Sequence, residues 1–300
     1  MSQSGAFVTA AVDWANDAGM GFRHIVSLGN KAVLDETDFV EAWGDDEGTN
    51  VVVGYLEGIE DGGEFIETTK RVTDEGTPVV LVKSGRTEAG ARAVSSHTGT
   101  LAGSEKAYET AFRKAGVVRA HNAEELFDYA RALDSLPLPD SNGVAVVTNA
   151  GGPGVMATDA LGDSSLSLAE FDETTYDALT DALPETAAVY NPVDVLGDAP
   201  PSRFGDAVAE VLDDTNVGAC LVIACPTATF EFEDLAETVV ETARGSDVPV
   251  VTALMGGEGT TEARDILSEG GVPSYFDPAR GVRSLDAVAG YRRARERETG

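Results

Sequence analysis

The feature that most constrains this chain is an alternation of short, continuously apolar runs with amphipathic stretches along its whole length. Because the apolar runs do not alternate with polar residues, they are typical of strands buried on both faces of a parallel sheet. The expected strands are 25–28, 51–56, 78–82, 144–148, 220–224 and 249–253. The expected helices include 7–17, 37–43, 64–73, 104–114, 123–133 and 235–244. This order predicts an α/β protein of doubly wound parallel-sheet domains.

A short segment rich in Pro and polar residues, 136–143, separates two such patterns, and a new apolar run follows it. Since 300 residues suffice for two cores, we predict tandem domains at 1–137 and 138–300. The first domain opens on a small-residue loop that runs into a helix. In a doubly wound fold such a loop follows a strand, so we expect the first strand of this domain to be missing.

The charge balance is strongly acidic, with a net charge of −31 and 52 acidic residues, and the acids are dispersed rather than gathered in a tail. A dispersed acidic excess favours hydration at high salt, which predicts a halophilic source. The same charge repels nucleic acid and anionic membranes, so we expect neither as a partner. No apolar run reaches the roughly 20 residues of a membrane span, and the N-terminus lacks a basic signal-peptide region. These features predict a cytoplasmic protein.

The two cysteines, Cys220 and Cys225, both lie in one apolar stretch. We interpret them as small core residues rather than a disulfide or metal pair, and we expect no metal site in this chain.

Two strand–helix loops carry small residues. The first comprises Ser2, Gln3, Ser4 and Gly5, and the second includes Gly151, Gly152 and Gly154. Free N–H groups at a helix start, together with the helix macrodipole, make such loops suitable for anions. Neither loop is a Walker A motif or a full dinucleotide fingerprint. A tight turn that packs a helix on a sheet is the alternative interpretation of each.

Segment 83–103 holds several glycines, three basic residues and His97, without apolar periodicity. We therefore predict a functional loop there, with His97 as a candidate nucleophile, since neutral imidazole is nucleophilic near pH 7. An inert surface histidine is the alternative. The other two histidines, His24 and His121, are expected to be structural, because His121 precedes a helix capped by Asn122 with Glu125 at its third position.

Glu57 comes directly after the expected strand 51–56. Ligands of open α/β sheets gather at the carboxyl ends of strands, where a carboxylate can orient the far ring nitrogen of a histidine. The alternative is that Glu57 is simply one of many acids at a strand end.

Seven segments, taken together, resemble the α-subunit region of the NDP-forming acyl-CoA synthetases. The resemblance is closest to ADP-forming acetate–CoA ligases and more distant to succinyl-CoA synthetase. The segments occur in family order over nearly the whole chain, at 2–6, 26–32, 55–58, 83–93, 96–103, 148–155 and 191–194. The resemblance implies two tandem flavodoxin-like domains.

The resemblance also implies roles for individual residues. His97 matches the phosphohistidine of the family, and Glu57 matches the carboxylate that holds it. The helices after Ser2, Gln3, Ser4 and Gly5 and after Gly151, Gly152 and Gly154 match two helices whose N-termini cradle the phosphoryl group. Gly29 and Asn30 match a loop close to the acyl-CoA thioester.

The implied reaction converts acyl-CoA, phosphate and ADP into a carboxylic acid, CoA and ATP through an acyl phosphate and phospho-His97. CoA and ATP or ADP, with Mg²⁺ on the nucleotide, are then substrates of the complete enzyme, and we expect this chain to bind none of them tightly. The family's CoA-binding Rossmann domain and ATP-grasp domain have no counterpart in this sequence. We therefore expect both as partner domains or subunits, a small carboxylic acid as substrate, and an oligomer.

The sequence is also compatible with two alternatives to this catalytic function. The chain could be a non-catalytic binding or regulatory module, or a fragment inactive alone. A flavodoxin-like domain that binds flavin is the third interpretation.

Overall fold

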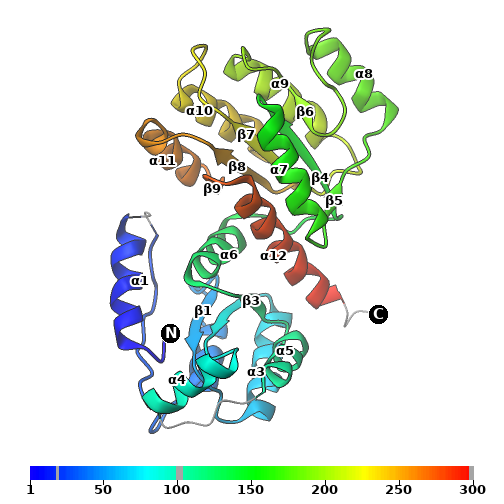
Figure 1. Cartoon of the computed structure of the whole chain (residues 1–300). Helices are drawn as coiled ribbons and strands as arrows, with labels where there is room; N and C mark the ends of the chain where they lie inside the picture. The colour runs from blue at the N-terminus through cyan, green and yellow to red at the C-terminus, as the bar shows by residue number, and fades with distance from the viewer. Residues whose placement is uncertain (18–19, 99–103, 297–300) are drawn as a thin grey trace. The chain divides into compact units, whose positions relative to one another are not determined.

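The computed structural model describes residues 1–17, 20–98 and 104–296 of the chain (Figure 1). Contacts divide the chain into two compact units. Unit 1 runs from Met1 to Asp134 and includes the described residues from Arg293, whereas unit 2 runs from Ser135 to Arg292. The predicted domain boundary at 137/138 lies three residues from this division.

Unit 1 is built on a parallel sheet with the strand order β1–β2–β3. These strands are β1 (Val52–Leu56), β2 (Val79–Lys83) and β3 (Val118–Ala120). The helices are α1 (Gly5–Asp17), α2 (Glu36–Gly44), α3 (Gly62–Glu75), α4 (Glu88–Thr98), α5 (Glu105–Lys114) and α6 (Ala123–Ser135). Side chains of β1 and β2 pack with those of α2, α3 and α5 in one buried apolar cluster, for example Phe65 against Phe112 with ring centroids 6.2 Å apart.

The first residues of the chain correct the expectation of a missing strand. Ser2 forms parallel bridges to Ser27 on one side and to Tyr55 on the other. Its N–H donates to the Val26 carbonyl at 3.0 Å, and the Tyr55 N–H donates to the Met1 carbonyl at 3.1 Å. A strand position is therefore occupied beside β1, although only by one bridge residue. For the same reason the predicted strand 25–28 is reduced to a single bridge at Ser27.

The predicted loop 83–103 also needs a correction. Lys83 ends β2, and residues 88–98 form helix α4, while residues 99–103 lie outside the described part. The helix escaped the sequence pattern because its apolar contact is slight: Val94 is buried and packs against Gly85, whose φ is +75°. A single buried residue gives no amphipathic periodicity.

Unit 2 contains a parallel sheet with the order β5–β4–β7–β8–β9, and β6 pairs with β4. The strands are β4 (Gly143–Thr148), β5 (Ser167–Leu168), β6 (Val193–Asp194), β7 (Ala219–Ala224), β8 (Val250–Leu254) and β9 (Ser274–Tyr275). The helices are α7 (Gly151–Gly162), α8 (Glu173–Ala182), α9 (Pro201–Leu212), α10 (Phe232–Ala243), α11 (Thr261–Glu269) and α12 (Pro278–Glu296), with a 3₁₀ turn at Glu258–Thr260. The predicted central strands 144–148, 220–224 and 249–253 are confirmed.

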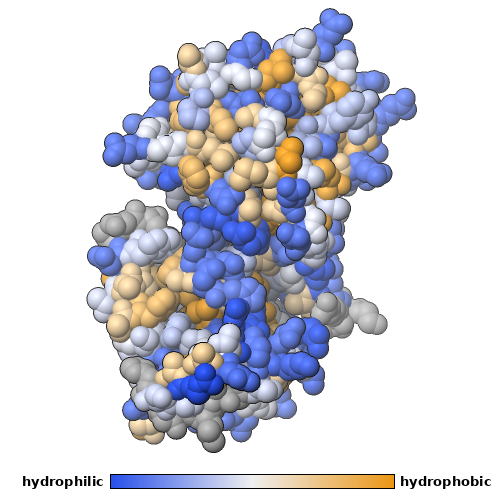
Figure 2. All heavy atoms as spheres, in the orientation of Figure 1, coloured by the Kyte–Doolittle hydropathy of each residue, from blue (hydrophilic) through white to orange (hydrophobic). Residues whose placement is uncertain are grey.

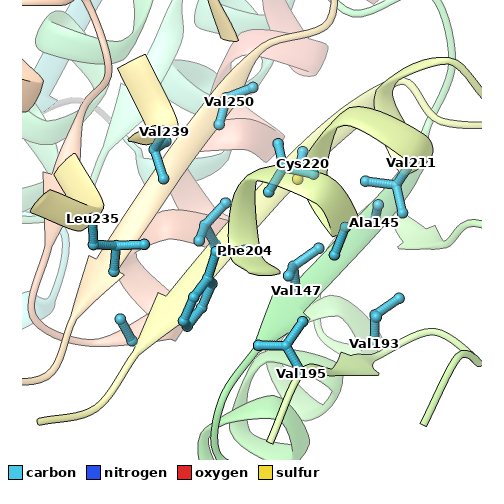
Figure 3. Close-up of a cluster of buried hydrophobic side chains, with 14 of the residues drawn as sticks. Ala145, Val147, Val193, Val195, Phe204, Val211, Cys220, Leu235, Val239 and Val250 are labelled. Atoms are coloured by element: carbon cyan, nitrogen blue, oxygen red, sulfur yellow. The ribbon is translucent and has the colours of Figure 1, made fainter. Parts of the chain in front are cut away.

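The sheet of unit 2 is covered on both faces, as a doubly wound fold requires. Alternate residues of the strands, such as Val147 and Cys220, face α8 to α11, where Phe204 and Leu235 complete a large apolar cluster (Figure 3). The other residues of the same strands face α7 and α12. Continuous apolar strands therefore follow from burial on two faces.

Both cysteines are free thiols. Cys220 is fully buried in β7, as predicted, and this burial raises the pKa of its thiol to about 12. Cys225 lies just beyond the strand and is only partly buried, so its interpretation as a core residue was wrong in degree.

Hydrophilic side chains cover much of the viewed face of each unit, interspersed with hydrophobic ones (Figure 2). Among the described residues, no helix has the length and apolar character to cross a bilayer.

Candidate functional site

The carboxyl edge of the unit 1 sheet presents Glu57 as the first residue after β1. Its side chain is buried, with the residue only 7% exposed. Its Oε2 atom has no hydrogen-bond partner among the described residues. A buried carboxylate oxygen without a donor is costly unless a group outside the described residues pairs with it. The Glu57 Oε2 atom is therefore available to accept a hydrogen bond from a group outside the described residues.

The backbone at Glu57 is held by Gln3, from the first small-residue loop. The Gln3 Oε1 atom accepts the N–H of Glu57 at 2.5 Å and that of Gly58 at 3.0 Å. The Gln3 N–H donates in turn to the Tyr55 carbonyl at 3.0 Å. Because its oxygen is taken, Gln3 has only its NH₂ group left for a ligand. The first loop and the strand end that carries Glu57 are thus joined directly.

Lys83, at the end of the neighbouring strand β2, is 2% exposed. Its Nζ atom donates to the Ser84 carbonyl and lies 4.5 Å from the ring centroid of Tyr108. Burial lowers the pKa of Lys83, and the charge of Glu105 opposes that shift, with a smaller contribution from Glu57. The edge of this sheet therefore holds buried charges of both signs. Sequence analysis placed Lys83 in a loop and did not foresee its burial.

Helix α1 begins directly after the first loop. The Ser4 Oγ atom accepts the N–H of Phe7 at 3.3 Å and so caps the helix. The Ser2 hydroxyl donates to the Ser4 carbonyl at 2.9 Å and accepts the Ser4 N–H at 3.0 Å, and Ser2 is buried. Because Ser2 is engaged within the loop, the groups left for an anion are the first-turn N–H groups of Gly5 and Ala6, which have no acceptor within the helix.

The second small-residue loop differs from its predicted form, because α7 already begins at Gly151 rather than near 155. Its N-cap residue, Ala150, makes no side-chain capping bond. The N–H groups of Gly151 and Gly152 are therefore uncapped at the start of the helix. A Cβ atom at Gly152 would meet nothing within 4 Å, so space in front of this turn is open.

Two side chains fasten this loop to the sheet of unit 2. Thr148 Oγ1 donates to the Ala150 carbonyl at 3.0 Å and accepts the Ala150 N–H at 3.1 Å. Asn149 Nδ2 donates to the Cys225 carbonyl at 3.0 Å, and its Oδ1 accepts the Cys225 N–H at 2.9 Å. The loop is therefore fixed by neutral groups. The motif at 191–194 supports β4 in a similar way, because the Asn191 amide bonds to Val144, Val146 and Ala169.

The other predicted site residues are placed less completely. The backbone of His97 lies in the last turn of α4, and its side chain lies outside the described residues. Gly29 and Asn30 are exposed on a turn that the Lys31 N–H closes onto the Leu28 carbonyl at 3.2 Å.

The structural interpretation of His24 and His121 fits their contacts. His24 Nε2 lies 3.1 Å from Asp46 Oδ2. The Asn122 side chain accepts the Glu125 N–H at 2.8 Å, and Glu125 Oε2 accepts the His121 N–H at 2.8 Å, which confirms the predicted cap. The His121 ring also lies beside Arg86 in a cavity of about 380 Å³ at the ends of β1 and β2. Within the described residues, no group of three or more His, Cys, Asp or Glu residues could hold a metal ion.

Comparison with known proteins gives two family matches in tandem. Residues 1–133 match the succinyl-CoA ligase-like flavodoxin domain, and residues 144–299 match the ligase-CoA domain. Acetate–CoA ligase [ADP-forming] I of Archaeoglobus fulgidus is 44% identical over 99% of this chain, which covers 42% of that relative. The alpha subunit of acetate–CoA ligase [ADP-forming] I of Pyrococcus furiosus is 39% identical over 96% of this chain, which covers 62% of it.

A solved structure of dinucleotide-forming acetyl-coenzyme A synthetase 1 from Ca. Korarchaeum cryptofilum, in complex with phosphate and ADP, matches with a TM-score of 0.93 and 35% identity. The match covers 98% of this chain and 64% of that chain. The chain thus spans between about two fifths and two thirds of the length of these relatives.

Proposed function

The chain belongs to the ligase-CoA domain family, and we propose that it is the phosphoryl-carrying part of an ADP-forming acyl-CoA ligase. His97 would accept the phosphoryl group, and Glu57 would orient its ring. The relatives named as ADP-forming acetate–CoA ligases support this activity class, and the two flavodoxin-like domains support the fold.

The observation that carries the proposal is the unpaired oxygen of Glu57. Its Oε2 atom is buried at the carboxyl edge of a parallel sheet and lacks a donor among the described residues, and the backbone of Glu57 is bonded to Gln3 in the loop that leads into α1. An imidazole N–H bonded there would have its other nitrogen unprotonated and nucleophilic. The carboxylate would also stabilise the cationic ring that forms when the phosphoryl group is added.

The proposed reaction proceeds in three balanced steps. An oxygen of hydrogen phosphate attacks the thioester carbonyl, the C–S bond breaks, and CoA leaves as a thiolate that takes up the proton that the phosphate gives up. A His97 ring nitrogen then attacks the phosphorus of the acyl phosphate, and the P–O bond breaks to release the carboxylate. Finally, a β-phosphate oxygen of ADP attacks, the P–N bond breaks, and ATP forms. Mg²⁺ would neutralise charge on the nucleotide.

This chain would stabilise the transferred group mainly with fixed dipoles. The sequence has only five lysines, but the first turns of α1 and α7 both present N–H groups. Preorganised N–H donors stabilise phosphoryl oxygens without the desolvation that a buried lysine requires. Gly5 in unit 1, and Gly151 and Gly152 in unit 2, would be the donors.

The remaining parts of the reaction belong to partners under this proposal. The Pyrococcus furiosus relative is an alpha subunit by name. We therefore expect a β-type ATP-grasp chain to bring ADP and a CoA-binding domain to bring the thioester, within an oligomer. A small carboxylic acid would be the acyl substrate. A cytoplasmic location and a halophilic source stay predictions from composition.

The test is transfer of label from γ-labelled ATP to the chain in the presence of the ATP-binding partner and Mg²⁺. We expect wild type to take up a phosphoryl group that is labile in acid and stable in base. His97→Asn should take up none. His24→Asn is the matched control, because His24 is bonded to Asp46 away from Glu57, and it should label like wild type.

Equal labelling of His97→Asn and wild type would contradict the proposal. Absence of label on wild type, with an active partner, would instead favour a non-catalytic module.

A further inference from the structure

A buried ion pair stands beside the strand end that carries Glu57. Lys31 Nζ lies 2.7 Å from Glu36 Oε2, and the two side chains are 1% and 0% exposed. A charge pair so completely removed from water is costly to desolvate, so it is weak support for stability as such. The contacts of Lys31 and Glu36 instead favour a role of the pair in holding the backbone of a neighbouring segment in place.

Both members of this pair contact the same segment, the one that follows β1. Lys31 Nζ donates to the Gly58 carbonyl at 2.7 Å, one residue beyond Glu57. Glu36 Oε1 accepts the Glu60 N–H at 3.0 Å. Segment 57–60 is therefore held by Lys31 and Glu36. Gln3 also binds this segment, through the N–H groups of Glu57 and Gly58. We call Lys31, Glu36, Gly58 and Glu60 the Lys31 clamp.

The backbone of Lys31 is itself in an unusual conformation. Its φ is +52°, in the left-handed region, although it is not glycine. A residue with a Cβ atom keeps such a conformation only where surrounding contacts hold it. Here the buried side chain supplies those contacts, and the exposed turn with Gly29 and Asn30 precedes it directly.

We infer that Lys31 is a positioning residue for phosphoryl transfer, acting through the Gly58 carbonyl to hold Glu57 in place. This inference rests on the proposed function, since it assigns the Glu57 carboxylate a partner on His97. Lys31 has no place in the chemistry itself. It fixes segment 57–60, and it couples the turn at Gly29 and Asn30 to the same segment.

The experiment compares variants of the full chain with the ATP-binding partner, by initial rate of label uptake from γ-labelled ATP. We expect Lys31→Met to slow labelling at least tenfold. Lys31→Arg keeps a charged donor and should stay within about threefold of wild type. Amide hydrogen exchange of segment 57–60 should accelerate in Lys31→Met and remain slow in Lys31→Arg.

A charge-balanced double variant separates positioning from stability. Lys31→Met with Glu36→Gln removes both charges and retains an acceptor for the Glu60 N–H, but loses the bond to the Gly58 carbonyl. We expect its thermal midpoint to return toward that of wild type while labelling stays at least tenfold slow. Recovery of labelling together with the midpoint would overturn the inference, because the pair would then be structural only.

Label uptake by wild type distinguishes a failure of the proposed function from a failure of the role inferred for Lys31. If wild type labels and His97→Asn does not, yet Lys31→Met labels at the wild-type rate, the inference fails and the proposed function stands. If wild type takes up no label, the proposed function fails and the inference fails with it.

Discussion

The carboxyl edges of the two sheets carry different kinds of side chain. In unit 1 the edge carries buried charges, Glu57 and Lys83, and the Lys31 clamp beside them. In unit 2 the loop before α7 is fastened by two neutral side chains, Thr148 and Asn149, around an uncapped helix start, and the charged group at this edge is Asp194 at the end of β6. Under the proposed function, unit 1 would orient the reacting side chain through Glu57, and unit 2 would offer the N–H groups at the start of α7.

The helix starts show the same contrast. In unit 1 the first turn of α1 is capped by Ser4, and the oxygen of Gln3 is bonded to segment 57–58. In unit 2 the first turn of α7 begins with two glycines and no side-chain cap. A capped helix has part of its N–H potential used, whereas an uncapped one leaves it to a ligand. We therefore expect substitutions at the start of α7 to reduce phosphoryl uptake more than substitutions at the start of α1.

The largest effect is expected from Gly152→Asp. The new side chain would enter the open space before α7 and place a negative charge where a phosphoryl group would bind. Loss of oxyanion donors typically costs about 100-fold to 1000-fold, so labelling should fall by at least about 100-fold. The fold should survive, because an acidic residue in the first turn suits the helix dipole.

Thr174→Asp is the control for Gly152→Asp, since it adds the same charge to the exposed first turn of α8. It should label like wild type. Equal loss in both variants would mean that net charge, and not the α7 start, determines the effect.

Glu57→Gln tests the charged edge of unit 1. The amide keeps the size of the side chain but no longer stabilises a cationic imidazole. Carboxylates that orient metal-bound histidines typically contribute about 10-fold to 100-fold, and we expect a loss of labelling of at least about 10-fold by analogy. Glu64→Gln, on the exposed first turn of α3, is the matched control and should have no effect. If Glu57→Gln takes up label as fast as wild type, Glu57 does not assist phosphoryl transfer.

Gln3→Leu should act mainly on stability. Its loss leaves the N–H groups of Glu57 and Gly58 without their acceptor, which we expect to lower the free energy of unfolding by about 2 kcal/mol. Gln3→Glu retains an acceptor oxygen and should stay close to wild type. Urea denaturation of the three proteins measures the difference. If Gln3→Leu unfolds at the wild-type midpoint, the join between the first loop and segment 57–58 carries little energy.

Lys83 gives the smallest effect, a dependence of stability on pH. Burial lowers its pKa in the folded chain below the ordinary value of 10.5. Between the lowered pKa and 10.5 the unfolded chain binds more protons, so stability rises with pH in this window. The free energy of unfolding of wild type, relative to Lys83→Met, should increase as pH is raised toward 10.5. A constant difference would show that Lys83 titrates alike in both states.

Sequence analysis predicted the long central strands well, because strands buried on both faces read as continuous apolar runs. It missed α4, where Val94 is the one buried residue among those whose side chains the structure describes. It did not single out the strands β5, β6 and β9, which are two residues each. Elements this short leave no period to detect.

The candidate site was predictable only in part. Glu57 could be found because it follows an apolar run directly. The Lys31 clamp could not, since it depends on contacts between residues up to 29 positions apart and on the left-handed backbone of Lys31. The capping role of Ser4 and the internal bonds of Ser2 likewise depend on loop geometry that the motif alone does not specify.

A chase experiment measures whether His97 carries a phosphoryl group between substrates. The chain is labelled with γ-labelled ATP and its partner, freed of nucleotide, and then mixed with unlabelled ADP and Mg²⁺. We predict that the label on His97 passes to ADP as labelled ATP at least as fast as the complete enzyme turns over. Label that stays on the chain, or that leaves more slowly than turnover, would show that His97 does not carry the phosphoryl group in the reaction.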